Sequence, residues 1–129
     1  MRHRHKLTKL GRNYNQRQAL FRQLVNALIM HEKIKTTIAK AKVLGGLMDK
    51  LFTQAKKGTL AARRQLLAFL GYKPAVHKLM DELAPRTQAR KSGFTKIIRV
   101  GTRHGDNAML AQIEFIDKPV VTPKKEEKK

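Results

Sequence analysis

The first acidic residue of this chain is Glu32, so the opening 31 residues contain no negative side chain. Their cations are Arg2, Arg4, Lys6, Lys9, Arg12, Arg17 and Arg22. Residues 1–14 contain too few apolar side chains to bury a surface of their own, so this segment cannot fold by itself. We expect 1–14 to be an extended basic arm that becomes ordered on a polyanionic partner.

The charge balance of the whole chain points to the same kind of partner. Lys and Arg number 29 against 9 Asp and Glu, which gives a net charge of +20. A domain this basic repels itself unless a polyanion neutralises it, and nucleic acid is the commonest polyanion. With 129 residues, 41% of them hydrophobic, the chain can fill one core and not two. We expect one globular domain over 15–116 and a charged, disordered, flexible tail over 117–129.

Several classes of protein are disfavoured by what the sequence lacks. Without cysteine there is no disulfide, no thiolate chemistry and no cysteine-based zinc site. No apolar run approaches the roughly 18 residues that a membrane-spanning helix requires. A membrane-active cationic protein is an alternative, but the first predicted helix carries too little charge to favour it. A nucleoid-type DNA-binding protein is the stronger alternative, because composition alone allows it.

Helical periodicity indicates two helices in the first half of the chain. The first has Asn15 as its N-cap and ends near Met30. The second follows Thr37 and stops before Gly58, with a bend or a frayed turn at the glycine pair 45–46. Its apolar stripe is Ala41, Leu44, Met48, Leu51, Phe52 and Ala55.

Two further helices follow. The third fits 60–70. Thr59 precedes it as an N-cap, and Gly71 follows at the C′ position, where glycine is the preferred residue. The fourth begins at Pro74, and Pro85 should end it, since proline does not continue a helix easily. The side chains that this helix should bury are Val76, Leu79, Met80 and Leu83.

The hydrophobic period changes from helical to alternating in three segments, which predicts strands. They are 33–37, 94–100 and 109–116, and the last two form a hairpin with Arg103 and His104 at a basic tip. On the last strand the predicted buried face is Met109, Ala111, Ile113 and Phe115. The fold class is therefore α+β, with about four helices packed on a small three-stranded sheet, an extended basic N-terminal arm and a disordered C-terminal tail.

No pattern of residues points to catalysis. Asp81 and Glu82 are adjacent on a predicted helix, so their carboxylates point in different directions and do not form an acid–base pair. The glycine pair 45–46 lacks the Lys-Ser/Thr ending of a phosphate-binding loop. We expect no enzyme, no cofactor and no small-molecule substrate.

The start Met1-Arg2-His3 has the spacing of a square-planar Cu(II) or Ni(II) site. A histidine among arginines and lysines is more often another polar contact to phosphate, so no metal is expected. For the lysines scattered on the predicted helices, such as Lys50, Lys56 and Lys78, we expect solvent-exposed side chains without a binding role.

Residues in both halves of the chain match the sequence pattern of a known protein family. In the first half, the matching residues are Met1-Arg2-His3-Arg4, Leu10-Gly11-Arg12, Arg17, Ala19, Arg22, His31-Glu32, Ile34, Thr36-Thr37 and Ala39-Lys40-Ala41-Lys42. In the second half, they are Ala62-Arg63-Arg64, Ala84-Pro85-Arg86, Gly93, Thr95, Ile97-Ile98, Arg103, Gly105-Asp106 and Ile113-Glu114. Over about residues 1 to 116 this combination closely resembles the bacterial-type family of large-subunit ribosomal protein seventeen. The chain departs from the family at Val43, where an acid is usual, and near Gly46, where a proline is usual.

The resemblance implies a structural constituent of the large ribosomal subunit that binds its RNA near the exit of the peptide tunnel. The implied partners are large-subunit ribosomal RNA and neighbouring ribosomal proteins, and the implied location is on the cytoplasmic ribosome, in support of translation. It places the RNA-binding residues first at Arg2, His3, Arg4, Gly11, Arg12, Arg17 and Arg22, with His5, Lys6 and Lys9 beside them, and second at Arg63, Arg64, Arg86, Arg90 and Arg103. Glu32 and Thr36 also match, but an acid and a strand threonine are poor phosphate ligands, so we expect capping and sheet roles for them.

Overall fold

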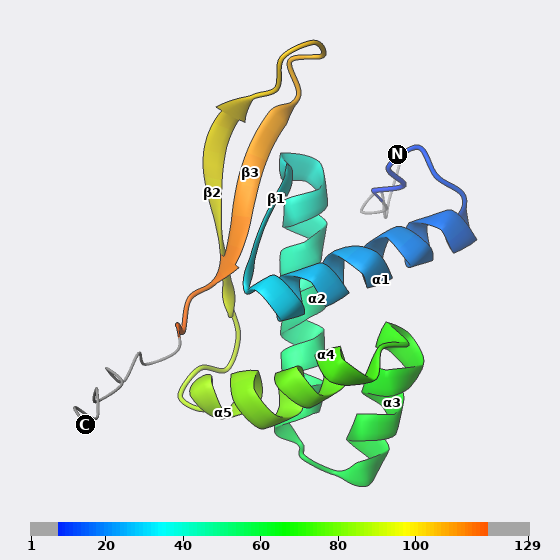
Figure 1. Ribbon diagram of the computed structural model, residues 1–129, viewed down its shortest axis with the longest axis vertical. Helices are drawn as coiled ribbons and strands as arrows, with labels where there is room; N and C mark the ends of the chain where they lie inside the picture. Colours follow the sequence, from blue (N-terminus) through cyan, green and yellow to red (C-terminus); the bar gives the residue numbers. More distant parts are fainter. Residues whose placement is uncertain (1–7, 119–129) are drawn as a thin grey trace, which may run out of the picture.

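The computed structural model of the protein describes residues 8–118. In chain order the elements are α1 (Tyr14–His31), β1 (Lys33–Thr37), α2 (Ile38–Lys56), α3 (Leu60–Leu70), α4 (Lys73–His77), the π-helical turn η1 (Lys78–Leu83), α5 (Ala84–Arg86), β2 (Thr95–Thr102) and β3 (Met109–Phe115). Because α4, η1 and α5 follow one another without a gap, the described part of the chain forms four helices and one sheet (Figure 1). The predicted α+β class is confirmed.

The sheet is antiparallel with the strand order β1-β3-β2, so the last strand in the chain lies at its centre. The predicted joining of 33–37 to the hairpin is therefore confirmed. The hairpin of β2 and β3 extends beyond the helices and ends in a free tip (Figure 1). Near this tip the pairing of β2 shifts between Arg99 and Gly101, which leaves Val100 as a bulge.

The core lies between α2 and the inner face of the sheet. All six apolar residues predicted for α2 are buried, and Phe52 is at their centre with no exposed surface. Its ring stacks on Phe94 at a centroid distance of 4.5 Å and meets the edge of Phe115 at 5.4 Å. Ala111, Ile113 and Phe115 are buried as predicted, but Met109 is 40% exposed. Its pair with Thr102 is the last before the hairpin turn, where the helices no longer cover the sheet.

Two helix boundaries follow the local signals closely and one does not. Thr59 accepts a hydrogen bond from the backbone N–H of Ala62, and Gly71 closes α3 with a φ of +64°. The first helix, by contrast, is capped by Asn13 and not by Asn15, and so begins two residues earlier than predicted. The Asn13 side chain accepts from the N–H of Gln16 at 3.0 Å, the same spacing that made Asn15 look like a cap.

The second helix is continuous through the glycine pair, so the predicted frayed turn is wrong. A Cβ atom at Gly45 would lie 3.4 Å from Thr95 Oγ1 on β2, so the helix and the sheet approach each other closely at this position. Packing against the sheet holds the helix in place despite its low propensity there.

The prediction that Pro85 ends the fourth helix is also wrong, because α5 continues to Arg86. In a regular α-helix the proline ring meets the carbonyl four residues earlier. Here the turn before it is π-helical, and the N–H of Ala84 bonds to Leu79 O, five residues back. This wider winding removes the clash. The helix ends at Thr87, whose hydroxyl donates to Leu83 O or Ala84 O at 3.3 and 3.1 Å.

Predictions for residues 1–7 and 119–129 lie outside the described residues. These include most of the basic arm, the Met1-Arg2-His3 start and nearly all of the tail.

Candidate nucleic-acid interface

Every acidic side chain between residues 8 and 118 has a partner within the chain. Asp49 accepts from the backbone N–H groups of Gly93 and Phe94, both at 3.2 Å. The others form the ion pairs Glu32–Lys78, Glu32–Arg86, Asp81–Arg63, Glu82–Arg86, Asp106–Arg103, Glu114–Lys96 and Asp117–Arg90. The described carboxylates therefore neutralise only part of the positive charge.

A larger set of cations has no carboxylate partner among residues 8–118. It comprises Lys9, Arg12, Arg17, Arg22, Lys33, Lys35, Lys40, Lys42, Lys50, Lys56, Lys57, Arg64, Lys73, Lys91, Arg99 and Lys118. Such uncompensated charge creates a positive field that attracts polyanions.

Of the first group of predicted RNA-binding residues, the described residues Lys9, Gly11, Arg12 and Arg17 lie at or just before the start of α1. Leu10 and Gly11 both have positive φ and form a turn, in which the N–H of Arg12 bonds to Lys9 O at 3.1 Å. One guanidinium nitrogen of Arg17 donates to Arg12 O at 3.1 Å. The positive end of the helix dipole adds to the charge of Lys9, Arg12 and Arg17 at this point.

Arg22 has a structural contact that the sequence does not reveal. Its Nε donates to Phe69 O at 2.7 Å, and Asn26 Nδ2 donates to Leu70 O at 3.1 Å. Both carbonyls belong to the last turn of α3, which has no intrahelical donors for them. Arg22 is nevertheless exposed, so the same side chain can join α1 to α3 and present positive charge outward.

The second group of predicted RNA-binding residues is spread over the molecule. Arg63, Arg86, Arg90 and Arg103 are each held by a carboxylate, whereas Arg64 is exposed and has no described acidic partner. Arg103 directly follows β2 in the hairpin turn, and the α5 helix lies toward the opposite end of the molecule from this turn (Figure 1). Residues 84–105 contain no acidic side chain, but because they reach from α5 to the hairpin tip they do not form one continuous basic surface. Contact of these arginines with RNA stays a prediction.

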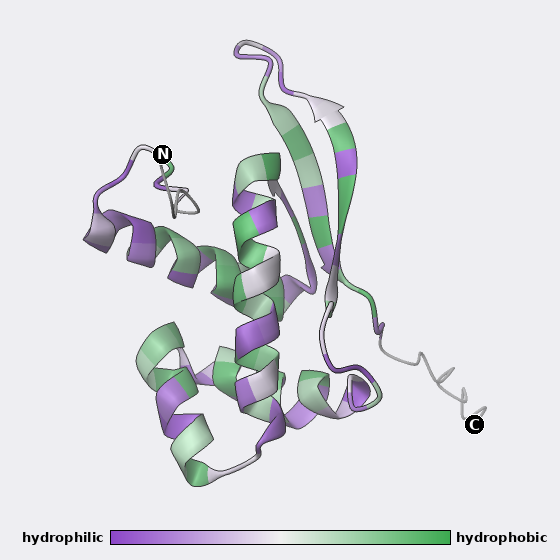
Figure 2. Cartoon of the chain, turned by 180° about the vertical axis from the view of Figure 1, so that it is seen from behind, coloured by the Kyte–Doolittle hydropathy of each residue, from purple (hydrophilic) through white to green (hydrophobic). Residues whose placement is uncertain are grey.

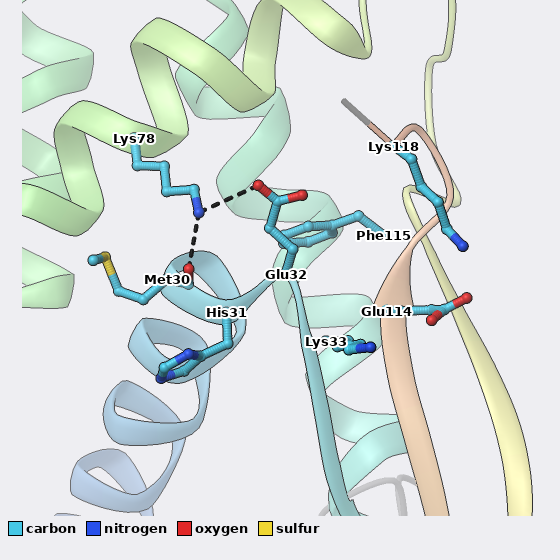
Figure 3. A pocket seen from close by; sticks show the side chains of 8 residues that line it. All are labelled: Met30, His31, Glu32, Lys33, Lys78, Glu114, Phe115 and Lys118. Atoms are coloured by element: carbon cyan, nitrogen blue, oxygen red, sulfur yellow. Dashed lines mark hydrogen bonds and ion pairs between the residues drawn. The ribbon is translucent and has the colours of Figure 1, made fainter. Parts of the chain in front are cut away.

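Among the acids of residues 8–118, Glu32 has the most polar contacts. It ends α1 in the left-handed conformation, with a φ of 62°, and its N–H bonds to Leu28 O, so the predicted capping role is confirmed. Both carboxylate oxygens lie 3.2 Å from an Arg86 nitrogen, and Lys78 Nζ lies 3.2 Å from one of them. Lys78 also donates to Met30 O at 2.8 Å (Figure 3). We call Glu32, Lys78 and Arg86 the Glu32 junction; it joins α1 and β1 to η1 and α5.

A pocket of about 360 Å³ lies beside the Glu32 junction. Its lining includes Lys33 from β1, Glu114 and Phe115 from β3, and Lys118 after the sheet (Figure 3). Three lysines line the pocket against two carboxylates that already have partners within the chain, so the pocket keeps a small positive charge.

The predicted solvent-exposed position is found for Lys50. The same prediction is wrong for Lys56 and Lys78, whose side chains make contacts within the protein. Lys56 Nζ donates to Thr87 O at 2.6 Å and to Arg90 O, and it lies 4.5 Å from the ring centroid of Phe94. It thereby fixes the loop that follows the last helix. These carbonyl partners are far away in sequence, so no local pattern could have indicated them.

The outer face of the sheet carries one carboxylate between two lysines. Glu114 on β3 pairs in register with Lys33 on β1 and with Lys96 on β2. Lys96 Nζ lies 2.8 Å from Glu114 Oε1, and this hydrogen bond is the main cause that lowers the pKa of Glu114. The Gln112 amide donates to the second oxygen at 3.0 Å and lowers the pKa further. The carboxylate is ionised and fully engaged at neutral pH.

A pH titration tests the ion pair at the hairpin tip. The hydrogen bond from Arg103 and that from the N–H of Ala108 lower the pKa of Asp106 from 3.8 to about 2. A carboxyl whose pKa is lower in the folded state stabilises the fold above its unfolded pKa, and this contribution is lost as the pH falls toward 2. NMR titration should place the Asp106 midpoint near 2 in the protein and closer to 3.8 in Arg103→Ala. A midpoint near 3.8 in both would show that the pair does not persist in solution.

The described residues contain no helix long and apolar enough to cross a membrane. Within 8–118 there is also no group of three or more His, Asp or Glu side chains placed to hold a metal ion. Asp81 and Glu82 pair with arginines on their own sides of the helix and do not face each other.

The fold and the charges together define a small, basic α+β protein whose surplus cations face outward, the class that includes many nucleic-acid-binding structural proteins. The family model described as ribosomal protein L17 matches residues 20–116, and the chain belongs to this family, as predicted.

Three relatives carry the name large ribosomal subunit protein bL17. The chain is 45% identical to that of Desulfosudis oleivorans over 99% of its own length, but it spans 62% of that longer protein. It is 47% identical to that of Desulfotalea psychrophila, with 90% of each chain covered. To that of Bradyrhizobium diazoefficiens it is 48% identical, over 93% of this chain and 87% of the relative.

Proposed function

We propose that this chain is a structural constituent of the large ribosomal subunit, which binds large-subunit ribosomal RNA near the peptide tunnel exit and supports assembly and translation in the cytoplasm. Its other partners are neighbouring ribosomal proteins, and it performs no catalysis. Family membership and the names of the relatives support the ribosomal role. The observation that carries RNA binding is that each acid of residues 8–118 has an internal partner while many cations lack one.

The proposed mechanism is electrostatic. Arginine and lysine side chains neutralise converging phosphates and release condensed counterions, so the affinity should fall steeply as the salt concentration rises. Arginine also presents a planar fork that fits a phosphate with two hydrogen bonds. The cluster of Lys9, Arg12 and Arg17 lies where the basic segment 1–14 meets the folded body, so both can contact the same RNA.

A nucleoid-type DNA-binding role remains the competitor, because a net charge of +20 attracts duplex DNA as well as RNA. The two roles differ in selectivity. A ribosomal protein should prefer large-subunit ribosomal RNA over duplex DNA at equal salt and should migrate with intact large subunits in a sucrose gradient, at moderate and at high salt. Migration with chromosomal DNA would overturn the ribosomal proposal.

The triple variant Arg2, Arg4 and Arg12→Ala tests the role of the basic segment. We expect weaker binding to a large-subunit RNA transcript and a slope of log affinity against log salt that is less steep by roughly 0.7–0.9 for each lost phosphate contact. The melting temperature of the isolated protein should not change, since Arg12 lies outside the core and the segment 1–14 is predicted to be an arm outside the globular domain. Lys96→Ala is the control for loss of a positive charge, because Lys96 is already paired with Glu114 and is not among the predicted RNA-binding residues. Equal loss of stability and binding in the triple variant would contradict the division into arm and body.

A further inference from the structure

A groove of about 910 Å³ opens between α1, α2 and α3. From behind, α2 stands in the centre of the molecule with α1 and α3 to one side of it (Figure 2). The floor of the groove is apolar and consists of Phe21, Val43, Leu47 and Phe69. Phe21 is almost fully buried, whereas Leu47 and Phe69 keep part of their surface open to the groove.

Gly46 lines the groove without adding a side chain to it. It lies inside α2, where glycine is unfavourable compared with alanine. A Cβ atom at Gly46 would meet nothing within 4 Å, unlike one at Gly45, and the backbone of Gly46 does not have a positive φ. Neither packing nor backbone conformation therefore requires glycine at this position. Its effect is to leave the apolar floor uncovered.

The charges around the groove all have the same sign. Lys42 and Lys50 lie on one face of α2, about two turns apart, and both are exposed. Among the described residues neither has a carboxylate partner, and no acid lines the groove. Arg22, held by Phe69 O at 2.7 Å, adds a third cation at the Phe69 end. An occupant should therefore combine a flat apolar group with flanking negative charge.

We propose that this groove binds one unstacked nucleobase of RNA, with the adjoining phosphates on Lys42, Lys50 and Arg22. This proposal rests on the proposed function and assigns a specific subsite to it. Bases that leave a helix are held against aromatic and apolar side chains, and such contacts tolerate any base identity because every base has an apolar face. An apolar protein segment would also fit the floor, but three cations without an acid favour RNA.

Filling the groove tests the proposal without harming the fold. Gly46→Leu places a side chain over the floor, and Gly46→Ala strengthens the helix while filling little space. Thr53→Leu is the matched control, since it adds the same side chain at an exposed position of α2 outside the groove. Circular dichroism melting should show Gly46→Leu to be folded. The probe is a large-subunit ribosomal RNA transcript, examined by chemical probing of its unpaired bases and by filter binding over a series of salt concentrations.

We expect Gly46→Leu to lose protection of one or a few unpaired bases while the rest of the footprint persists. Its affinity should fall by roughly 5- to 100-fold with an unchanged salt slope, because base contacts and not phosphate contacts are removed. Lys50→Ala should instead reduce the slope. Gly46→Ala and Thr53→Leu should keep the complete footprint.

Three results would overturn the proposal in distinguishable ways. If the unmodified protein shows no preference for ribosomal RNA, the proposed function fails. If the unmodified protein binds the RNA and Gly46→Leu gives an identical footprint and affinity, RNA binding stands and the groove is not a base site. Loss of Gly46→Leu from purified large subunits, with an intact RNA footprint, would assign the groove to a neighbouring protein.

Discussion

Phe52→Ala should destabilise the folded protein by about 3–5 kcal/mol, the range for truncation of a buried aromatic side chain. The ring has no exposed surface and lies between Phe94 and Phe115, which come from the beginning and the end of the β2–β3 hairpin region. Its removal leaves a cavity and separates α2 from two segments at once. A domain of this size has a total stability of about 5–15 kcal/mol, so the loss is a large share.

Urea denaturation followed by circular dichroism measures this loss. Leu60→Ala is the control, because Leu60 is 63% exposed and its truncation should change the free energy of unfolding by no more than about 0.5 kcal/mol. If Phe52→Ala unfolds at the same urea concentration as Leu60→Ala, Phe52 is not at the centre of the core in solution.

Glu32→Gln should have the second largest effect, a destabilisation of about 1–3 kcal/mol. The amide keeps the shape of the side chain but removes the negative charge that holds Lys78 and Arg86 together. The side chains of Glu32, Lys78 and Arg86 are only 25, 20 and 22% exposed, so water replaces the lost charge incompletely. The junction joins α1 and β1 to the last helix, and its loss should weaken that contact.

Glu82→Gln is the control for the Glu32 junction. Glu82 also pairs with Arg86, but its side chain is 57% exposed and the atoms are 3.5 Å apart. Exposed pairs of this kind contribute about 0–1 kcal/mol. Denaturation curves for Glu32→Gln and Glu82→Gln that coincide would show that the junction contributes no more than a surface pair.

The elements that the sequence predicts well are those with local signals at both ends. The third helix has a hydroxyl cap at Thr59 and a left-handed glycine at Gly71, and its predicted bounds agree with the structure. The strand β1 is also found at its predicted residues, because alternation and β-branched side chains coincide there. Both signals act within a few residues, so no knowledge of the remaining chain is needed.

The predictions that proved wrong concern features that depend on contacts between residues far apart in the sequence. Whether a helix passes Pro85 depends on the π-helical winding of the preceding turn, which packing of Leu79 and Leu83 in the core maintains. From the sequence, Lys56 is expected to be a surface lysine. In the structure, the loop after α5 brings two backbone carbonyl groups to its Nζ atom. Distant partners of this kind leave no periodic pattern in the sequence.

The same distinction holds for the candidate interface. Sequence alone reveals the basic opening of the chain, since charge is a property of composition. It does not reveal which arginines already have a carboxylate, because Arg90 finds Asp117 and Arg63 finds Asp81 only after folding. It also missed the groove, whose aromatic side chains come from different helices.

The strand order β1-β3-β2 has a consequence for the timing of folding during synthesis. The two outer strands leave the ribosome before the central one, and β1 must wait until 109–115 has been made. At about 5–20 residues per second this delay is on the order of several seconds. Throughout that time β1 has an unpaired edge that can associate with other chains. Completion of the sheet therefore has to wait for the synthesis of β3, and a chain truncated before β3 cannot assemble any of it.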